Sequence, residues 1–535
     1  MVHNNTNDKA DSQWVENSGG LIEHSPGNVV IKSIADDTAP PTLKELLKYW
    51  RPFLWCFFMY MLSLNLGYES SNLGHLLGVR EFMYKFGYRT SAGTWVISTT
   101  DQQLLTIAGF IGLGSAAIAT GILSDLLGRR KTILLGCLLC FGGIFLQFFA
   151  KSIMMLFGGK ILSGLGYGLG HSIGPVFVAE IAPVRFRGVC LSIINVTITL
   201  GQWCNALAIY FCQNLSSDMA WRIPVVTQVL FPSVLLLIGI PFLPESPAWL
   251  VFKGKLDEAA QSLRVFNGND YDTDRAIAIL ETALDEAKHS EETNARWIET
   301  IQGTNRRRTL LSCMGFACQQ LIGASFMAGY VSYFFVLAGV NNPFGMGQMV
   351  YSFELLGNMC SWPLIERVGR RRILLCGMIF MTTTLLITGC VSLNKGQAAL
   401  KATVSLMTIW AFVYQMTAGA VVFAIAGETP SPRLRQKTFA LNVTTANILS
   451  TVVQLLLPYL INTDKANLGG KVAFVFFGPS VPCCIYLYFC LPEMKGRNVA
   501  EIEEMYRKKL PARKFEGYKC EVTGVESKYT KEFES

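Results

Sequence analysis

Charged side chains are scarce in this 535-residue chain: they make up 16% of it, against 51% hydrophobic residues, and the mean hydropathy is +0.35. Soluble globular domains carry roughly 25% charged residues, so a string of soluble domains is excluded. Long polar runs are also missing through most of the chain, and about twelve apolar stretches reach the roughly 20 residues that cross a bilayer. The composition therefore predicts a multi-pass, all-α membrane protein whose solvent is mainly lipid.

The apolar stretches lie near residues 53–77, 103–124, 132–150, 153–178, 189–212, 223–243, 309–332, 345–365, 373–392, 401–426, 437–461 and 472–491.

Several other features are missing. The first fifty residues lack the charged and apolar segments of a cleaved signal peptide, so we expect the first apolar stretch to direct insertion. The 15 cysteines are scattered through the apolar stretches with no histidine at metal-ligand spacing, which favours small apolar filler over a metal centre or a disulfide framework. No nucleophile stands with a base, and no phosphate loop occurs. We expect neither an enzyme nor a cofactor.

Basic residues cluster in short loops that fall on one side if the stretches alternate in direction. These loops carry Gly128-Arg129-Arg130-Lys131, Arg185 and Arg187, Arg306-Arg307-Arg308, Gly369-Arg370-Arg371-Arg372, and Arg433, Arg435 and Lys437. The positive-inside rule makes that side cytosolic and places both termini there. Topology thus explains the net charge of +8, and no nucleic-acid partner is needed.

An internal repeat divides the chain into two halves. Three short motifs recur in the same order about 245 residues later: Asp125–Arg130 as Glu366–Arg371, Glu180–Arg187 as Glu428–Arg435, and Pro244-Glu245 as Pro492-Glu493. Parallel repeats of this kind are typical of secondary transporters, in which the substrate site lies near the midplane between two halves that rock. The predicted segments are a cytosolic tail at 1–48, six-helix halves at 49–243 and 309–491, a helical intracellular linker at 244–308 and a cytosolic tail at 492–535.

The repeated loops also predict ion pairs. In each half an acidic residue precedes Gly-Arg-Arg, and arginine forks from that turn can bridge to Glu180 and Glu428. We expect such pairs to close the cytosolic side and to break when the cavity faces inward; alternatively, the arginines only set topology. The candidate gate residues are Asp125, Arg129, Arg130, Glu180, Arg187, Glu366, Arg370, Arg371, Glu428 and Arg435.

The motifs together resemble the sugar porter family of the major facilitator superfamily. The resemblance rests on GRRK, ERVGRR, the Glu180–Arg187 segment, PESPAWL, QQLIGASF and PEMKGRNVAEIEEMY, and it covers about residues 49–506. Three segments, Trp410–Tyr414, Gly427–Thr438 and Tyr330–Phe335, are most similar to fungal α-glucoside (maltose-type) proton symporters. The resemblance implies a twelve-helix fold that works by alternating access.

Glu69 interrupts the first apolar stretch within the segment GYESSNLG. A charge at the bilayer centre costs roughly 2.5–3.5 kcal/mol on insertion scales and marks function by default. The resemblance implies that Glu69 carries the coupled proton and pairs with Lys160 of the fourth stretch. Proton-coupled relatives usually have aspartate and arginine at these two positions, so both side chains are changed here. A structural ion pair in an uncoupled carrier is the alternative.

The resemblance also implies a midplane cavity whose amide and aromatic side chains bind a polyhydroxylated substrate. Three departures from the family pattern change that pocket: Ser325 and Glu354 each stand where asparagine is usual, and Ala420 replaces a proline. Glu354 could hydrogen-bond a hydroxyl group, attract a cationic ligand or face a crevice between helices. The candidate substrate-binding residues are Asn195, Gln202, Gln319, Gln320, Ser325, Glu354 and Phe423.

Three polar positions have simpler interpretations. His75 and His171 have no second ligand at metal spacing, so we expect solvated or hydrogen-bonded histidines. Asn214-Leu215-Ser216 is a glycosylation sequon in a loop predicted to be external. The mixed-charge tail from Lys508 to Ser535 is predicted to be disordered.

The sequence thus predicts a monomeric transporter in the plasma membrane that moves a sugar, an α-glucoside or related oligosaccharide, together with a proton. Three alternatives stay open at this stage: an uncoupled sugar facilitator, a transporter of a glycosylated or other non-sugar metabolite, and a transporter-like nutrient receptor. The short C-terminal tail argues against the receptor.

Overall fold

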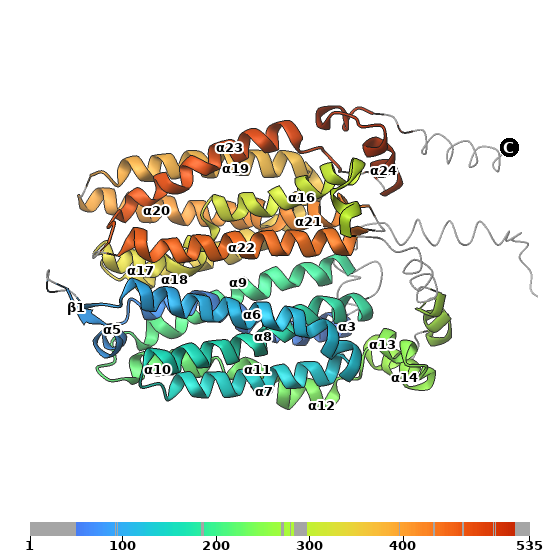
Figure 1. Ribbon diagram of the computed structural model, residues 1–535, viewed down its shortest axis with the longest axis horizontal. Helices are drawn as coiled ribbons and strands as arrows, with labels where there is room; N and C mark the ends of the chain where they lie inside the picture. The colour runs from blue at the N-terminus through green and yellow to red at the C-terminus, as the bar shows by residue number, and fades with distance from the viewer. Residues whose placement is uncertain are drawn as a thin grey trace, which may run out of the picture.

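The computed structural model describes residues 50–90, 93, 95–182, 187–268, 272–278, 280–282, 297–394, 396–431, 434–462, 465–495, 497, 499–518 and 520. Most of these residues are helical, and the helices form two bundles that lie side by side (Figure 1). The first bundle contains α3 (Trp50–Met59), α4 (Met61–Leu76), α6 (Thr99–Leu127), α7 (Arg129–Phe148), α8 (Ile153–Ile181), α9 (Arg187–Cys212), α10 (Met219–Thr227), α11 (Leu230–Val234), the π-helix η2 (Leu235–Gly239) and α12 (Ile240–Phe242).

The second bundle has the same up-and-down arrangement. It contains α16 (Gly303–Leu321), α17 (Ala324–Leu337), α18 (Pro343–Val368), α19 (Arg370–Val391), α20 (Gln397–Tyr414), the π-helix η4 (Gln415–Gly419), α21 (Ala420–Glu428), α22 (Arg435–Ile461), the short 3-10 helix η6 (Gly469–Lys471) and α23 (Val472–Cys490).

The two ends of the molecule differ. One end carries α5 (Arg80–Phe86) and an antiparallel pair of short strands, β1 (Tyr88–Arg89) and β2 (Trp95–Val96), in which Tyr88 pairs with Val96. The other end carries α13 (Pro247–Phe252), α14 (Leu256–Asn267), η3 (Trp297–Ile301), α24 (Val499–Arg507) and η7 (Ala512–Lys514) (Figure 1). We call these the hairpin end and the linker end.

All twelve predicted stretches are helical in the structure. Within the described residues, nine helical segments are also long and apolar enough to cross a bilayer. The other three stretches form α3 and α4, α9, and α18; α4, for example, buries Glu69, Asn72 and His75. Because these three are not among the nine segments, the count of twelve membrane crossings stays a prediction.

Glycines let the helices that line the interior approach closely. On α4, a Cβ added at Gly67 would lie 2.0 Å from the carbonyl oxygen of Ile198 in α9, and a Cβ at Gly201 of α9 would lie equally close to that of Leu64. Between the bundles, a Cβ at Gly74 would lie 1.5 Å from the carbonyl oxygen of Gly329 in α17. Backbones this close leave no room for a side chain, so these contacts fix where α4 lies.

At the hairpin end an ion pair ties α5 to the start of α10. Lys85 Nζ lies 2.5 Å from Asp218 Oδ2, and Arg222 Nη2 lies 3.3 Å from the same oxygen. The hydrogen bond from Lys85 is the main reason that the pKa of the Asp218 carboxyl lies below its ordinary value of 3.8. Asn214 is exposed at this end, so the sequon is accessible and its glycosylation stays a prediction.

The linker packs partly on itself and partly on the first bundle, where the Phe266 ring of α14 meets those of Trp55 and Phe177. Leu250 and Val251 of α13 and Ala259 of α14 form a small apolar cluster that Ile277 and Leu280 join. The first part of the predicted linker is therefore helical, as α13 and α14. Between α14 and η3 the structure describes only residues 268, 272–278 and 280–282.

The prediction of a disordered tail from Lys508 onward was wrong for its first part. Residues 508–518 are folded against the second bundle, and Phe515 is fully buried. Arg497 holds this segment by donating to the carbonyl oxygens of Phe515, Glu516 and Tyr518 at 2.7–3.4 Å. Composition missed these contacts because backbone carbonyls, which every sequence has, are the acceptors. Residues 521–535 lie outside the described part.

Candidate functional site

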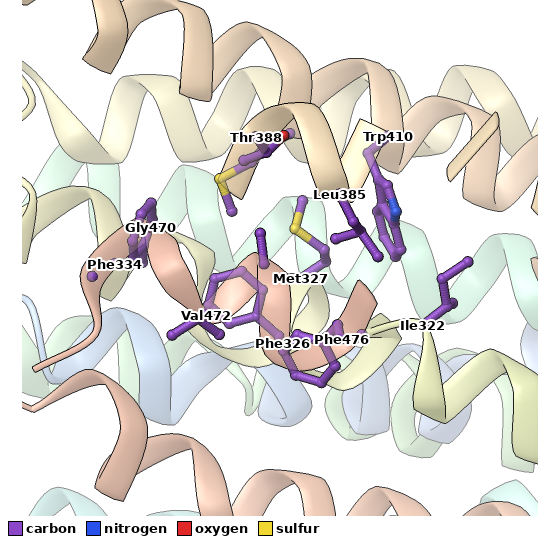
Figure 2. A pocket seen from close by; sticks show the side chains of 14 residues that line it. Ile322, Phe326, Met327, Phe334, Leu385, Thr388, Trp410, Gly470, Val472 and Phe476 are labelled. Carbon is purple, nitrogen blue, oxygen red and sulfur yellow. The ribbon is translucent and has the colours of Figure 1, made fainter. Parts of the chain in front are cut away.

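An apolar pocket in the second bundle is not the functional site. It lies among α17, α19, α20 and α23, holds only about 30 Å³, and is lined mainly by apolar side chains such as Phe326, Met327, Trp410 and Phe476 (Figure 2). A space of this size admits a water molecule or two and no metabolite. Its lining contains no charged residue.

The candidate site is a cavity of about 320 Å³ between the two bundles. This volume falls in the range of small-molecule sites. Its lining is mixed, with amide, hydroxyl and carboxylate groups set among apolar ones. The polar residues that line it are Glu69, Ser70, Thr106, Lys160, Tyr167, Asn195, Thr199 and Gln202 from the first bundle, and Gln320, Ser325, Tyr330, Glu354, Tyr414, Gln415, Asn447, Ser450 and Gln454 from the second.

Glu69 and Lys160 are brought together as predicted. Lys160 Nζ of α8 donates to Glu69 Oε1 of α4, and both side chains are more than 90% buried. Two amides complete the site: Glu69 Oε2 accepts from Gln228 Nε2 at 2.9 Å and from Asn72 Nδ2 at 3.1 Å. One cation and two neutral donors thus surround the carboxyl group at the cavity wall.

The first bundle adds a row of amides from α9. Gln202 Nε2 donates to Ser70 Oγ at 3.3 Å, and Asn195 lines the same wall. The Asn195 Nδ2 atom is buried and has no hydrogen-bond partner. An unsatisfied buried donor is costly, so a donor left free on a cavity wall indicates a place for a ligand acceptor.

The second bundle supplies a connected polar network. Ser325 Oγ donates to Gln320 Oε1 at 2.6 Å and lies 2.9 Å from Ser450 Oγ, to which Gln454 Nε2 donates at 3.1 Å. The serine at 325 therefore links α16, α17 and α22. The predicted site residues Gln320 and Ser325 both belong to this network and both line the cavity.

Glu354 is a second buried carboxylate on the cavity wall, 3% exposed. Gln415, the first residue of η4, is a hydrogen-bonding neighbour of Glu354. Glu354 forms no ion pair with any residue that the structure describes. The Gln415 Oε1 atom is buried without a partner. Glu354 thus faces the cavity, which removes the alternative in which it faces only a crevice between helices.

The π-helix η4 positions Gln415. Ala420, which stands where the family resemblance leads one to expect a proline, follows η4 directly, and π-turns are frequent at functional sites. Gln319 Nε2 donates to the Ala418 carbonyl at 2.7 Å, which satisfies a backbone group there. Gln319 therefore supports the cavity wall and is not among the residues that line it.

Phe423 is the other predicted substrate-binding residue that the structure does not bring to the cavity. Its ring packs edge-on against Phe316 at 5.1 Å, and 44% of the residue is exposed. The aromatic residues that do line the cavity include Tyr167, Tyr330 and Tyr414. Sequence position alone did not indicate the face on which Phe423 lies.

Sequence reasoning also missed functional neighbours. Gln228, Asn72 and Gln415 bind the two buried carboxylates, and none of them was predicted. Each is a lone amide inside an apolar stretch, and because a buried amide requires partners, this signal could have found them.

The repeated loops at the linker end form the predicted ion pairs. Arg129 Nη2 donates to Glu180 at 3.0 Å, and Arg370 Nη2 donates to Glu428 at 2.9 Å. Arg129 also reaches Asp125 at 3.4 Å, and Arg371 donates to the Tyr488 carbonyl. The side chains of Arg187, Glu366 and Arg435 lie outside the described part of the structure.

Each loop is also bound by one further carboxylate, for which the sequence analysis predicted no role. Glu245 accepts from the backbone amides of Arg129 and Arg130, and Glu493 accepts from those of Arg370 and Arg371, at 2.9–3.3 Å. Each carboxylate thus satisfies free amides at a helix start. The preceding glycines, 128 and 369, have φ of 89° and 103°, and a Cβ there would collide with the carboxylate.

These pairs were expected to break when the cavity opens at the linker end. Each pair lies within one bundle and both are formed in this structure, so their breaking in another state stays a prediction. Among the described residues, hydrogen bonds between the bundles join α6 to α22 and its C-cap and α9 to α18: Gln102 and Thr99 with Asn462, Gln103 with Leu455, Trp203 with Ser352, and Thr199 with Asn358. They lie at the hairpin end or midway along the helices, so the loop pairs are not what holds the bundles together.

Comparison with known proteins agrees with this arrangement. The sequence profile of the Sugar (and other) transporter family matches residues 55–506. The General alpha-glucoside permease of Saccharomyces cerevisiae is 31% identical over 484 residues, which cover 89% of this chain and 78% of the permease. A maltose permease of the same yeast is 28% identical over 491 residues, covering 90% and 80%.

Among solved structures, the xylose transporter XylE from E. coli in a partially occluded inward open conformation superposes with a TM-score of 0.68 at 18% identity, covering 84% of this chain and 100% of that one. XylE described as a major facilitator superfamily proton:xylose symporter, bound to 6-bromo-6-deoxy-D-glucose, gives 0.66 at 19% identity, with 86% and 99% covered. These likenesses establish the fold.

The fold and the matched profile define a membrane transporter of the major facilitator type, not an enzyme. The chain belongs to the Sugar (and other) transporter family. The family predicted from the loop motifs is therefore confirmed.

Proposed function

We propose that this protein carries an α-glucoside, such as maltose, across the membrane together with a proton by alternating access. The observation that carries the proposal is the cavity between the bundles, where amides and hydroxyls from both bundles surround a space next to the buried Glu69–Lys160 pair. Free polar atoms on Asn195 and Gln415 match a ligand with many hydroxyl groups, because hydroxyls both donate and accept. The names of the yeast permeases support the substrate class.

The proton has a defined place in this proposal. Glu69 is the acidic group at the cavity wall that is directly paired with a cation. Its carboxyl group accepts from Lys160, Gln228 and Asn72, so taking up a proton requires one of these bonds to rearrange, and in this proposal it is the Lys160 bond. Glu69 binds a proton when substrate enters, and Lys160 restores the charge after release. XylE, which is described as a proton:xylose symporter, supports this coupling.

We also propose the orientation of the protein in the membrane. The linker end is cytosolic, both termini lie on that side, and the protein works as a monomer in the plasma membrane. The hairpin-end contacts between the bundles then close the outer side, and the structure corresponds to an inward-facing state. Asn214 lies on the outer side, where glycosylation occurs.

A second candidate substrate class rests on Glu354. Because no described cation offsets this carboxylate, the cavity also suits a glycosylated metabolite that carries an amino group. Such a ligand would pair its ammonium with Glu354, while an α-glucoside would donate hydroxyls to it.

Uptake measurements test the proposal. Cells that lack their own carriers and express this chain at the surface are given radiolabelled maltose, and separately glucose, with and without a protonophore. Protonophore-sensitive accumulation of maltose is the expected result. Uptake that only equilibrates would show an uncoupled facilitator, and no uptake of either sugar would direct the search to amine-bearing glycosides.

A further inference from the structure

A chain of buried hydrogen bonds leads from Glu69 to the contact between the bundles. Asn72 Nδ2 donates to Glu69 Oε2 at 3.1 Å, Asn205 Nδ2 donates to Asn72 Oδ1 at 3.1 Å, and Asn205 Oδ1 lies 2.5 Å from His75 Nδ1. All four residues are at least 94% buried. This chain was not predicted, since His75 was expected to be an isolated solvated or hydrogen-bonded histidine.

The far end of the chain lies where the bundles touch. The His75 ring stands edge-on against Tyr351 of α18 with 5.5 Å between ring centroids. The neighbouring Gly74 is the position where α4 and α17 approach most closely. His75 Nε2 is buried and has no hydrogen-bond partner. The histidine therefore belongs to the first bundle, but packs against the second.

The charge on Glu69 fixes the direction of every bond in the chain. An ionised carboxylate only accepts, so Asn72 must present its NH₂ group to it and its oxygen to Asn205. Asn205 must then present its own oxygen to His75, which requires the proton on Nδ1. The Ser71 backbone is also a hydrogen-bonding neighbour of this ring.

Protonation of Glu69 removes this constraint. A neutral carboxyl can donate to Asn72, which lets that amide turn over and bring its NH₂ against the NH₂ of Asn205. If Asn205 turns in response, its NH₂ meets the Nδ1–H of His75, and two donors face each other. The arrangement that places His75 against Tyr351 is then no longer satisfied.

We propose that Asn72, Asn205 and His75 form a relay that makes the hairpin-end contact between the bundles sensitive to the charge on Glu69, with His75 as a positioning residue for coupling. The inference rests on the proposed function, in which Glu69 carries the proton. It adds a physical link between proton binding and the contact that must open for alternating access.

Other titratable groups face the relay, and the variants used in the test leave them unchanged. Lys160 and Tyr167 of α8 and Tyr68 of α4 lie around Glu69, and Tyr351 lies against His75 with Glu354 beside it. Of these groups, Tyr68 is a hydrogen-bonding neighbour of the relay amide Asn205, and its hydroxyl also lies 2.6 Å from Thr227 Oγ1.

The experiment compares variants of the full chain in proteoliposomes. His75→Phe keeps an aromatic ring and removes the donor, and Asn205→Leu removes the middle link. His171→Phe is the matched control, because His171 is a partly buried histidine of the first bundle with a hydrogen bond to Ser63 at 3.2 Å, but is outside the relay. The readouts are accumulation of labelled maltose driven by an imposed pH gradient, its dependence on external pH, and maltose exchange without a gradient.

The relay predicts that His75→Phe and Asn205→Leu each reduce accumulation about five-fold or more beyond any loss of exchange, which corresponds to the lower end of typical coupling energies. We expect the dependence of accumulation on external pH to shift in both variants. The double variant accumulates no less maltose than either single variant. His75→Gln, which restores a hydrogen-bond donor, recovers part of the lost accumulation. Accumulation and pH dependence equal to those of His171→Phe, or equal losses of exchange and accumulation, would overturn the relay. A wild-type chain that exchanges maltose but never accumulates it would instead contradict the proposed proton coupling and remove the basis of the relay.

Discussion

At the scale of single residues, the two buried carboxylates differ in their neighbours. Glu69 has a cation and two amides, whereas Glu354 has an amide and no described cation. The sequence identified both residues, because an acidic residue inside an apolar stretch is a strong signal. The resemblance also paired Glu69 with Lys160, but the pattern did not show which amides meet these carboxylates, since Gln228 and Gln415 come from distant parts of the chain.

Glu354→Gln tests what the second carboxylate does. If Glu354 accepts a hydrogen bond from a sugar hydroxyl, the variant exchanges a charged acceptor for a neutral one, which weakens binding by about 1.5 kcal/mol. We expect the KM for maltose to rise about ten-fold while the maximal rate changes less. Glu354→Asp, which keeps the charge, is the control. A KM for maltose that is unchanged or lower would contradict hydroxyl recognition and favour a cationic substrate.

At the scale of helices, hydrophobic patterning predicted where helices lie, and the structure places one in every predicted stretch. Patterning could not predict which faces meet. Phe423 illustrates this limit, since its motif position suggested the cavity, yet its ring packs against Phe316 away from the lining. The π-helix at 415–419 turns the end of α20 and brings Gln415 to the cavity.

The close approach of α4 and α9 gives a prediction about stability. Gly67→Ala places a methyl group against the backbone of Ile198, and we expect it to cost about 1–3 kcal/mol and to lower the melting temperature. Gly114→Ala in α6 is the control, because no atom lies within 4 Å of its added Cβ; there the change should be neutral or slightly stabilising. Thermal unfolding in detergent measures both, and equal melting temperatures would contradict the packing.

The ion pair between α5 and α10 gives a pH dependence. The pKa of Asp218 is lowered in the folded state, so its contribution to stability is fully present above its ordinary value of 3.8 and is lost as pH falls through the lower folded value. We expect wild type to exceed Asp218→Asn in melting temperature by a constant amount between pH 5 and 7, and the difference to shrink below pH 3.8. A difference that grew with acidity would contradict the assignment.

At the scale of the whole molecule, the repeat in the sequence predicted two related halves, and the structure shows two bundles with matching loops (Figure 1). The repeat could not predict where along their length the two bundles are in contact. That depends on contacts such as Asn462 with Thr99 and Gln102, which join residues more than 350 positions apart.

Asn462→Ala tests whether these contacts set the balance between states. The variant loses two hydrogen bonds between the bundles, worth about 1–3 kcal/mol together, and should shift the equilibrium toward a state open at the hairpin end by about 5- to 150-fold. Faster labelling of a cysteine introduced at Thr106, on the cavity wall, by an impermeant reagent added at the hairpin side measures the shift. Asn442→Ala, which loses a hydrogen bond to Ser312 within one bundle, is the control. Equal labelling rates in the two variants would show that the Asn462 contacts do not hold that end closed.

The central claim is that Glu69 carries the coupled proton, and one measurement tests it most directly. Wild-type and Glu69→Gln chains are reconstituted in proteoliposomes, and labelled maltose is followed both under an imposed pH gradient and as exchange without one. The account predicts that wild type accumulates maltose above the external concentration, whereas Glu69→Gln exchanges maltose without accumulating it. Accumulation by Glu69→Gln equal to that of wild type would contradict it.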